Sequence, residues 1–198
     1  MGSVSPVPFA DKVFMKKVED RIVKPTVRGL REDKIDYRGF IFIGLMNCAG
    51  DPYVIEYNVR MGDPETESVF PRIKNDVVDL FENTARGTLD HCSLRVDPRT
   101  AACIMMVAGG YPEAYEKGNP IALGEEMDNV TVFHCGTKLG DDGQLLTNGG
   151  RVICTTALAE TLPEALLKSY NRAATITWDG KYLRRDIGQD LLKLMMME

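Results

Sequence analysis

Several features that mark common functional classes are absent from the sequence. It has only two histidines, His91 and His134, too few for a histidine-rich metal centre. No apolar run approaches the roughly 20 residues needed to span a bilayer. The N-terminus lacks the basic region and apolar core of a signal peptide. The net charge of -5, from 24 basic and 29 acidic side chains, provides no basic stripe for nucleic acid. We therefore expect neither a membrane nor a nucleic-acid partner.

The five cysteines are odd in number, widely separated and without a C-x-x-C pair. This pattern favours a reduced, cytoplasmic protein over a disulfide-stabilised secreted one. Cys103, Cys135 and Cys154 lie in apolar or strand-like runs, where a buried structural thiol is a more frequent role than a nucleophile or a metal ligand. With 198 residues, of which 44% are hydrophobic, the chain is long enough for one large or two small globular domains.

One stretch of the chain combines a strand pattern with chemically useful side chains. The run 54–59 is rich in β-branched and aromatic residues, which favour an extended backbone. Because alternate residues of a strand share a face, Glu56, Asn58 and Arg60 should project together. A glycine and a proline then stop the strand, which leaves Asp63 and Glu65 on a turn beside its end.

This stretch has two interpretations. The alternating polar residues are typical of the solvated face of an amphipathic strand. Glutamate and asparagine also provide oxygen ligands that Mg²⁺ accepts beside substrate phosphates, and arginine can bind a phosphoryl oxygen. The residues alone leave a solvated face and a metal-phosphate site equally open.

The first part of the chain should contain one loop and one helix. The glycine, serine and proline content of residues 1–8 predicts a loop. Asp11 can cap a helix whose apolar face carries Phe14, Val18 and Ile22, and Pro25 is expected to kink or split this helix.

A hairpin and a second helix should follow. A buried strand over residues 40–46 should pair antiparallel with the strand that begins at Tyr53. Apolar residues recur at helical spacing from Ile73 to Thr84, which predicts a helix packed on that hairpin and ended by Gly87.

A polar connector over residues 90–100 predicts a domain boundary near residue 95. Beyond it, four apolar runs between glycine-rich turns predict a small, mostly antiparallel sheet, with strands at 101–108, 130–135, 144–147 and 151–157. Thr161 and Glu164 form a T-x-x-E capping box, which predicts a helix packed on that sheet.

The stretch Arg60–Glu67, with Val54–Asn58 before it, resembles the signature of the phosphoribosylamine-glycine ligases, also called glycinamide ribonucleotide synthetases, in the ATP-grasp superfamily. Further segments resemble family blocks in the same order: Pro25–Val27, Gly39-Phe40 with Gly44–Met46, Gly109–Pro112, Phe133–Lys138, Thr147–Val152 and Arg185–Gly188. The resemblance covers essentially the whole chain, and blocks in register are far more specific than one motif.

The resemblance implies an α+β fold. Residues 1–95 would form the second half of an ATP-grasp domain, an antiparallel sheet with helices. Residues 96–198 would form a small, mostly antiparallel, β-rich C-terminal domain with a packed helix. The chain would then be the C-terminal portion of the enzyme, without the N-terminal domain and the first half of the ATP-grasp domain, and we expect it to be inactive alone.

The family consists of ATP-dependent carbon-nitrogen ligases of de novo purine biosynthesis. They join glycine to 5-phosphoribosylamine by way of glycyl phosphate, and they release glycinamide ribonucleotide, ADP and phosphate. The resemblance implies this activity for the full-length protein, with glycine and phosphoribosylamine as substrates and the missing N-terminal half as partner. Two alternatives stay open: another ATP-grasp carboxylate-amine ligase, or a non-catalytic domain that binds a partner or a nucleotide.

The resemblance also implies roles for single residues. Glu56 and Asn58 match the family's metal ligands, and the ion, Mg²⁺ or Mn²⁺, would bridge ATP phosphates. Arg60 is assigned to the transferred phosphoryl group, as a catalytic residue. Many ATP-grasp relatives have a further acidic ligand on the preceding strand, where this chain has Gly44.

The remaining assignments concern the substrates. Asp63 is assigned as a catalytic residue and Glu65 as a substrate-binding residue, both near the substrate amines. Alternatively, both residues shape the loop. Ser5 and Gly62 are further candidates for substrate binding. His134, Thr137 and Lys138 are candidates to close the site, although a strand histidine is more often satisfied by local hydrogen bonds.

Overall fold

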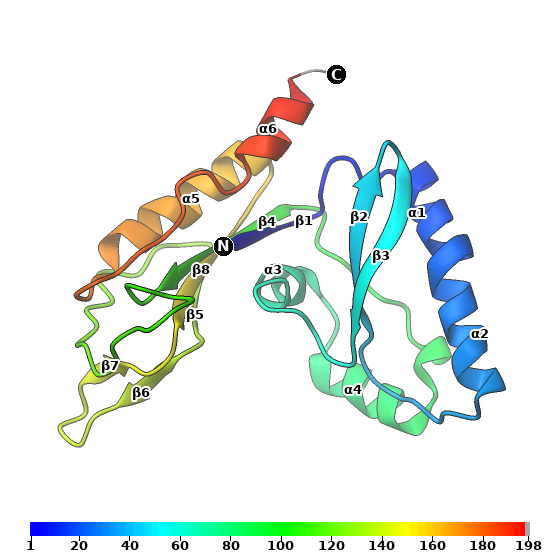
Figure 1. Cartoon of the computed structure of the whole chain (residues 1–198), viewed down its shortest axis with the longest axis horizontal. Coiled ribbons are helices and arrows are strands. Elements are labelled where there is room, and N and C mark those ends of the chain that lie inside the picture. The colour runs from blue at the N-terminus through cyan, green and yellow to red at the C-terminus, as the bar shows by residue number, and fades with distance from the viewer. Residues whose placement is uncertain (197–198) are drawn as a thin grey trace. The chain divides into compact units, whose positions relative to one another are not determined.

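The computed structural model describes residues 1–196, so the last two residues of the predicted C-terminal domain lie outside the described residues. The fold is α+β, and the chain divides into two compact units (Figure 1). The sheet unit comprises residues 1–6, 63–72 and those from 97 onward, and the hairpin unit comprises residues 7–62 and 73–96. The sheet unit also contains two segments from the first half of the chain, so the compact units do not correspond one to one with the predicted domains. The assignment of 1–95 and 96–198 to separate domains stays a prediction.

The sheet unit is built on four antiparallel strands in the order β1-β4-β8-β5. Their bounds are β1 Gly2–Ser5, β4 Thr100–Val107, β5 Val130–His134 and β8 Arg151–Ala159. A separate pair joins β6 (Thr137–Leu139) to β7 (Leu145–Thr147). The four strands predicted after residue 100 are thus confirmed as β4, β5, β7 and β8, whereas β6 was not predicted.

The core of this unit lies on β4 and β8, whose central residues are almost completely buried. One face of β4 carries Cys103, Met105 and Val107, which cluster with Cys154 of β8. The helix α5 (Leu162–Thr175) packs on β4 and β8, and a pair of hydrogen bonds fixes it there. The Ser169 hydroxyl donates to the Thr155 carbonyl oxygen at 2.6 Å, and the Thr155 hydroxyl donates back to the Ser169 carbonyl oxygen at 3.0 Å.

Helix ends in the sheet unit follow capping chemistry. The Thr161 hydroxyl accepts the Glu164 backbone N–H at 3.4 Å, so the predicted cap of α5 is confirmed.

A short helix α3 (Thr66–Val69) continues into a 3-10 turn and contacts β1, β4 and β8. The last helix, α6, covers Gln189–Met195. None of the helices in residues 1–196 is long and apolar enough to cross a membrane.

The loop predicted for residues 1–8 is wrong over Gly2–Ser5, which form the edge strand β1. Gly2 pairs with Ile104 and Ser5 pairs with Ala101 of β4. A Cβ on Gly2 would lie 2.5 Å from the Cys103 carbonyl oxygen, so only glycine permits this close approach. Local composition predicted a loop because the pairing partner lies about a hundred residues away in the chain.

The hairpin unit begins with a nearly continuous helical segment. Helix α1 (Lys12–Val18) passes through a π-helical turn (Glu19–Val23) into α2 (Lys24–Glu32). The Asp11 carboxylate accepts the Phe14 backbone N–H at 2.7 Å, which confirms the predicted cap. The predicted split takes the form of the π-helical turn just before Pro25, which lacks the N–H that an α-helix would use.

The predicted antiparallel hairpin is confirmed as β2 (Phe42–Cys48) and β3 (Asp51–Asn58). Ala49 and Gly50 both have positive φ, 52° and 86°, as the two central residues of a type I′ hairpin turn require. The prediction that residues 40–46 are buried is wrong, because β2 is half-buried to exposed along its length. Within the described residues β2 pairs only with β3, so its apolar side chains are not covered by a larger sheet.

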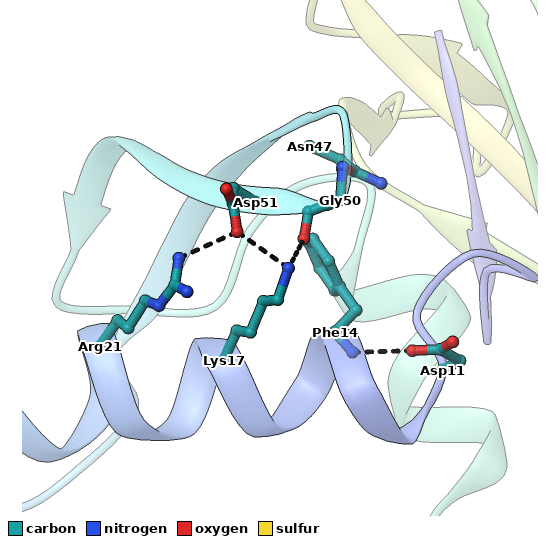
Figure 2. A network of polar contacts seen from close by, with 7 residues as sticks. All are labelled: Asp11, Phe14, Lys17, Arg21, Asn47, Gly50 and Asp51. Carbon is teal, nitrogen blue, oxygen red and sulfur yellow. Dashed lines mark hydrogen bonds and ion pairs between the residues drawn. The ribbon is translucent and has the colours of Figure 1, made fainter.

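An ion-pair network joins this hairpin to the helical segment (Figure 2). The Lys17 ammonium and the Arg21 guanidinium each donate to Asp51 Oδ1 at 2.9 Å. Lys17 also donates to the Gly50 carbonyl oxygen at 2.6 Å. The hydrogen bond from Lys17, followed by that from Arg21, lowers the pKa of Asp51 below its ordinary value of 3.8.

The second helix of the hairpin unit, α4, covers Val77–Arg86 and ends at Gly87, which has a φ of 73°. The prediction that it starts at residue 73 is wrong, because Ile73 forms a β-bridge with Val96 instead. The Phe81 ring packs edge-on against Phe40, just before β2, with ring centroids 5.9 Å apart. The helix therefore contacts the segment that leads into the hairpin.

We expect Asp51→Asn to destabilise the hairpin unit in a pH-dependent way. A lowered native pKa means that the Asp51 carboxylate stabilises the fold above pH 3.8, and that this contribution disappears as the pH falls through the native pKa. The urea midpoint followed by far-UV circular dichroism should be lower for the variant at pH 7, and the difference from the unchanged protein should shrink as the pH falls below 3.8. Fluorescence of Trp178, which lies in the sheet unit, is the control. A midpoint difference that persists undiminished at low pH would contradict the ion-pair explanation.

Candidate functional site

The segment 59–67 links β3 to the first residues of α3, and we call it the signature loop. The chain passes from the hairpin unit to the sheet unit within this loop, between Gly62 and Asp63. The candidate residues therefore fall into two groups, which are described separately.

The first group lies on β3. The Asn58 amide donates from Nδ2 to Glu56 Oε1 at 3.0 Å, so the predicted common face of these two residues is confirmed. Glu56 pairs with Gly44 of β2, where a Cβ would lie only 3.0 Å from Glu56 Cγ. The missing side chain at Gly44 thus leaves room for the Glu56 carboxylate.

These two side chains have the chemistry of a hard-cation site. A carboxylate and an amide are oxygen ligands of the kind that Mg²⁺ accepts, and Glu56 is exposed to solvent. The Asn58 amide would have to present its oxygen, and not its nitrogen, to a cation beside Glu56. The donor set therefore fits a divalent metal once the amide turns, which costs one hydrogen bond between the two residues.

Arg60 lies beyond the end of β3, because the strand stops at Asn58. Strand alternation therefore does not place Arg60 on the face of Glu56 and Asn58, as the sequence pattern predicted. The Arg60 guanidinium is exposed and donates to the Met61 carbonyl oxygen at 2.9 Å. The Tyr37 hydroxyl donates to the Phe40 carbonyl oxygen at 2.5 Å and also lies 3.2 Å from the Val59 carbonyl oxygen at the start of the loop.

The second group centres on Asp63 and Arg151, the first residue of β8. The Arg151 guanidinium donates from Nη1 to the Asp63 carbonyl oxygen at 2.7 Å and forms an ion pair with Asp63 Oδ1 at 3.2 Å. Its Nε donates to the Tyr111 hydroxyl at 3.0 Å. Burial lowers the pKa of Arg151, but its hydrogen bond to Tyr111 and the Asp63 carboxylate outweigh burial, so its pKa is raised overall. Arg151 remains charged and holds Asp63, the first loop residue that belongs to the sheet unit.

Arg151 and Tyr111 lie in sequence blocks that resemble the family, but the sequence pattern indicates no role for either residue. The available signal was the arginine that follows Gly149 and Gly150. A Cβ on Gly150 would overlap the Tyr111 ring, so this glycine lets the aromatic ring pack beside the arginine. Only the fold brings these two blocks to Asp63.

Ser5 and Glu65 also have defined contacts. The Ser5 hydroxyl accepts from Arg72 Nη1 at 2.8 Å, and Arg72 also donates to the carbonyl oxygens of Asp97 and Arg99. The Glu65 carbonyl oxygen accepts the Ser68 backbone N–H and hydroxyl at 3.1 and 3.0 Å. The main chain of Glu65 thus shapes the start of α3. Gly62 is buried.

His134 forms the local hydrogen bond that its strand position suggested. Its Nδ1 lies 3.0 Å from the Thr137 hydroxyl oxygen. Lys138 is exposed on β6. His134 thus has a local hydrogen-bond partner. That His134, Thr137 and Lys138 close a site stays a prediction.

Comparison with protein families identifies the group to which the chain belongs. Residues 1–66 match the model of the phosphoribosylglycinamide synthetase ATP-grasp (A) domain, and residues 101–190 match that of the phosphoribosylglycinamide synthetase C domain. This chain belongs to the phosphoribosylglycinamide synthetase family. The resemblance carried by the signature loop and the other blocks is therefore confirmed.

Individual members of the phosphoribosylglycinamide synthetase family agree with this assignment. The chain is 40% identical to a phosphoribosylamine-glycine ligase of Chlorobaculum tepidum and 42% identical to one of Salmonella typhimurium, with 97% and 95% of the chain covered. The crystal structure of the Thermotoga maritima phosphoribosylamine-glycine ligase superposes with a TM-score of 0.83 at 38% identity and covers 94% of the chain. The chain spans 46%, 44% and 46% of these three proteins, just under half of each.

We expect Arg151→Lys to loosen the signature loop without unfolding the sheet unit. A lysine retains the charge but cannot contact Asp63 and Tyr111 at once, so the loop should lose about 1–3 kcal/mol of stabilisation. Amide hydrogen exchange of residues 63–69 should accelerate by about an order of magnitude. Arg184→Lys is the matched control, because Arg184 forms an exposed bidentate pair with Asp186 in the same unit. Equal exchange rates in both variants would show that Arg151 does not restrain the loop.

Proposed function

We propose that this chain provides the metal-binding strand and the signature loop of a phosphoribosylamine-glycine ligase. The reaction is the ATP-dependent joining of glycine to 5-phosphoribosylamine in de novo purine biosynthesis. The observation that carries the proposal is the oxygen-donor pair of Glu56 and Asn58 directly before a loop whose Asp63 is held by Arg151, in a chain of this family. The free state of all five cysteines suits the reducing cytoplasm.

The first step is phosphoryl transfer to glycine. A glycine carboxylate oxygen attacks the γ-phosphorus of ATP, the bond to the bridging oxygen breaks, and glycyl phosphate and ADP result. Such transfers depend on positioning and charge neutralisation more than on covalent work by the protein. Glu56 and Asn58 would hold Mg²⁺ or Mn²⁺, which when bound neutralises phosphate charge. The exposed Arg60 guanidinium would bind a transferred phosphoryl oxygen.

The second step is amide formation. The phosphoribosylamine nitrogen attacks the carbonyl carbon of glycyl phosphate, phosphate leaves with the C–O bonding electrons, and the nitrogen loses a proton. Asp63 suits the binding of an amine because its side chain remains 45% exposed while Arg151 fixes its main chain. Glu65, the Gly62 backbone and the Ser5 hydroxyl are the further groups proposed to bind substrate.

The remaining half of the polypeptide would be the partner of this chain. The relatives are about twice its length, so we infer that ATP is held largely by residues outside the 198 present here.

We expect the isolated 198-residue chain to release no phosphate from ATP in the presence of glycine, phosphoribosylamine and Mg²⁺. A coupled phosphate assay should give the rate of the protein-free control, while the full-length enzyme should turn over under the same conditions. Turnover by the isolated chain would contradict the inference that it holds only part of the site. A full-length enzyme that prefers a different acid or amine would instead support another carboxylate-amine ligase.

We expect Glu56→Gln in the full-length enzyme to reduce turnover by about tenfold or more at limiting Mg²⁺, because the variant loses one ligand charge at a phosphate site. The apparent Mg²⁺ affinity should fall while the circular dichroism spectrum stays the same. Glu113→Gln, at an exposed position outside the hairpin, is the control. Unchanged turnover at limiting Mg²⁺ would rule out Glu56 as a metal ligand.

A further inference from the structure

Three potential metal ligands from separate segments converge within the sheet unit. Glu67 lies on α3, Cys135 follows β5 and Cys154 lies on β8. Their ligand atoms, one carboxylate oxygen and two Sγ atoms, all lie within 4.8 Å of one another. The sequence favoured a buried structural thiol at both cysteines. Cys154 is indeed buried, but Cys135 is exposed, so the group is open to solvent on one side.

The backbone fixes the two sulfur atoms near each other. Cys154 lies opposite Phe133 in the β5–β8 ladder. The backbone N–H groups of Cys135 and Gly136 both donate to the Val152 carbonyl oxygen at 3.0 Å, which holds Cys135 against β8 as the chain leaves β5. A Cβ on Gly136 would overlap the Arg151 carbonyl oxygen, so glycine is needed at this point. The two thiols are therefore positioned by the main chain before any ligand binds.

The third group, Glu67, has an unmet polar requirement. Its Oε2 is buried and has no hydrogen-bond partner among the described residues. Burial is the main cause that raises the pKa of Glu67. Its own backbone N–H lowers that pKa, the charges of Asp63 and Glu65 raise it further, and Arg151 lowers it. A bound cation would give Oε2 the partner that it lacks.

We propose that Glu67, Cys135 and Cys154 bind a thiophilic divalent cation of the Zn²⁺ class. Thiolates select such metals over Mg²⁺, and a carboxylate is an accepted third ligand. Zinc bound at roughly 2.0–2.3 Å places tetrahedral ligand atoms about 3.5 Å apart, so the side chains need to move by only about an ångström. Binding transfers the two thiol protons to solvent, and the fourth position stays open to water on the side of Cys135.

A cation at this site would affect the signature loop. Glu67 is the last residue of that loop and lies two residues after Glu65. The metal would bond it directly to two residues of the sheet. A bound metal would therefore restrain the same loop that Arg151 holds through Asp63. The mobility of the signature loop would then depend on whether the metal is bound.

The test uses the full 198-residue chain, reduced with a non-thiol phosphine and freed of metal. Titration with Co²⁺ should give a sulfur-to-metal charge-transfer band that saturates at one ion per chain and is displaced by Zn²⁺. Cys135→Ala should lose at least half of the band intensity, because one of two thiolates is removed. Glu67→Ala should keep the band but weaken Co²⁺ binding by about tenfold or more.

Cys48→Ala is the matched control, because Cys48 is also an exposed cysteine but lies in the hairpin unit. Its band should equal that of the unchanged chain, and Trp178 fluorescence should show that every variant is folded. The proposal is overturned if no stoichiometric band appears, if Cys135→Ala leaves the band unchanged, or if Cys48→Ala removes it. A Cys135–Cys154 disulfide that persists after reduction, detected by mass spectrometry, would also overturn it.

Discussion

The antiparallel pairing of β4 with β8 is the constraint on which the rest of the sheet unit depends. The two strands pair from Thr100 opposite Ala159 to Val107 opposite Arg151, and their central residues are almost completely buried. The outer strands β1 and β5 pair with this central ladder, and α5 packs on it. Because β8 begins at Arg151 and carries Cys154 three residues later, the same ladder positions both the arginine that holds Asp63 and the buried thiol. Loss of this pairing would therefore displace both sites at once.

The hairpin unit is held by a different balance of forces. Two strands alone are marginally stable in water, and the exposed Tyr53 and Ile55 show how little of this hairpin is covered in the described residues. Its stability therefore depends on the buried face of α1 and on the contacts of Lys17 and Arg21 with Asp51. These ion pairs are exposed and individually weak. Glu56 and Asn58 thus lie on a sparsely covered element, and turning the Asn58 amide toward a metal needs only a side-chain rotation that breaks its hydrogen bond to Glu56.

Features set by nearby residues could be predicted from the sequence, and features set by distant ones could not. The caps at Asp11 and Thr161, the hairpin and the long strands depend on contacts within a few residues, or on hydrophobic runs long enough to be read. The edge strand at Gly2–Ser5 was not predicted, because the strand with which it pairs is far away in the sequence. At the candidate site, the face shared by Glu56 and Asn58 followed from strand periodicity. The contact between Asp63 and Arg151 spans 88 residues and became visible only in the fold.

The two ends of the signature loop carry ligand sets of opposite chemical character. Glu56 and Asn58, just before the loop, are hard oxygen donors, whereas Glu67 at its end lies beside two sulfur atoms. Mg²⁺ dehydrates reluctantly and prefers oxygen, while Zn²⁺ binds thiolate strongly. The two thiolates of the second site therefore favour Zn²⁺ over Mg²⁺ there. A cation at the first proposed site would act on phosphate chemistry. A cation at the second would act through the mobility of the loop, because none of its three ligands is among the residues proposed to bind phosphate.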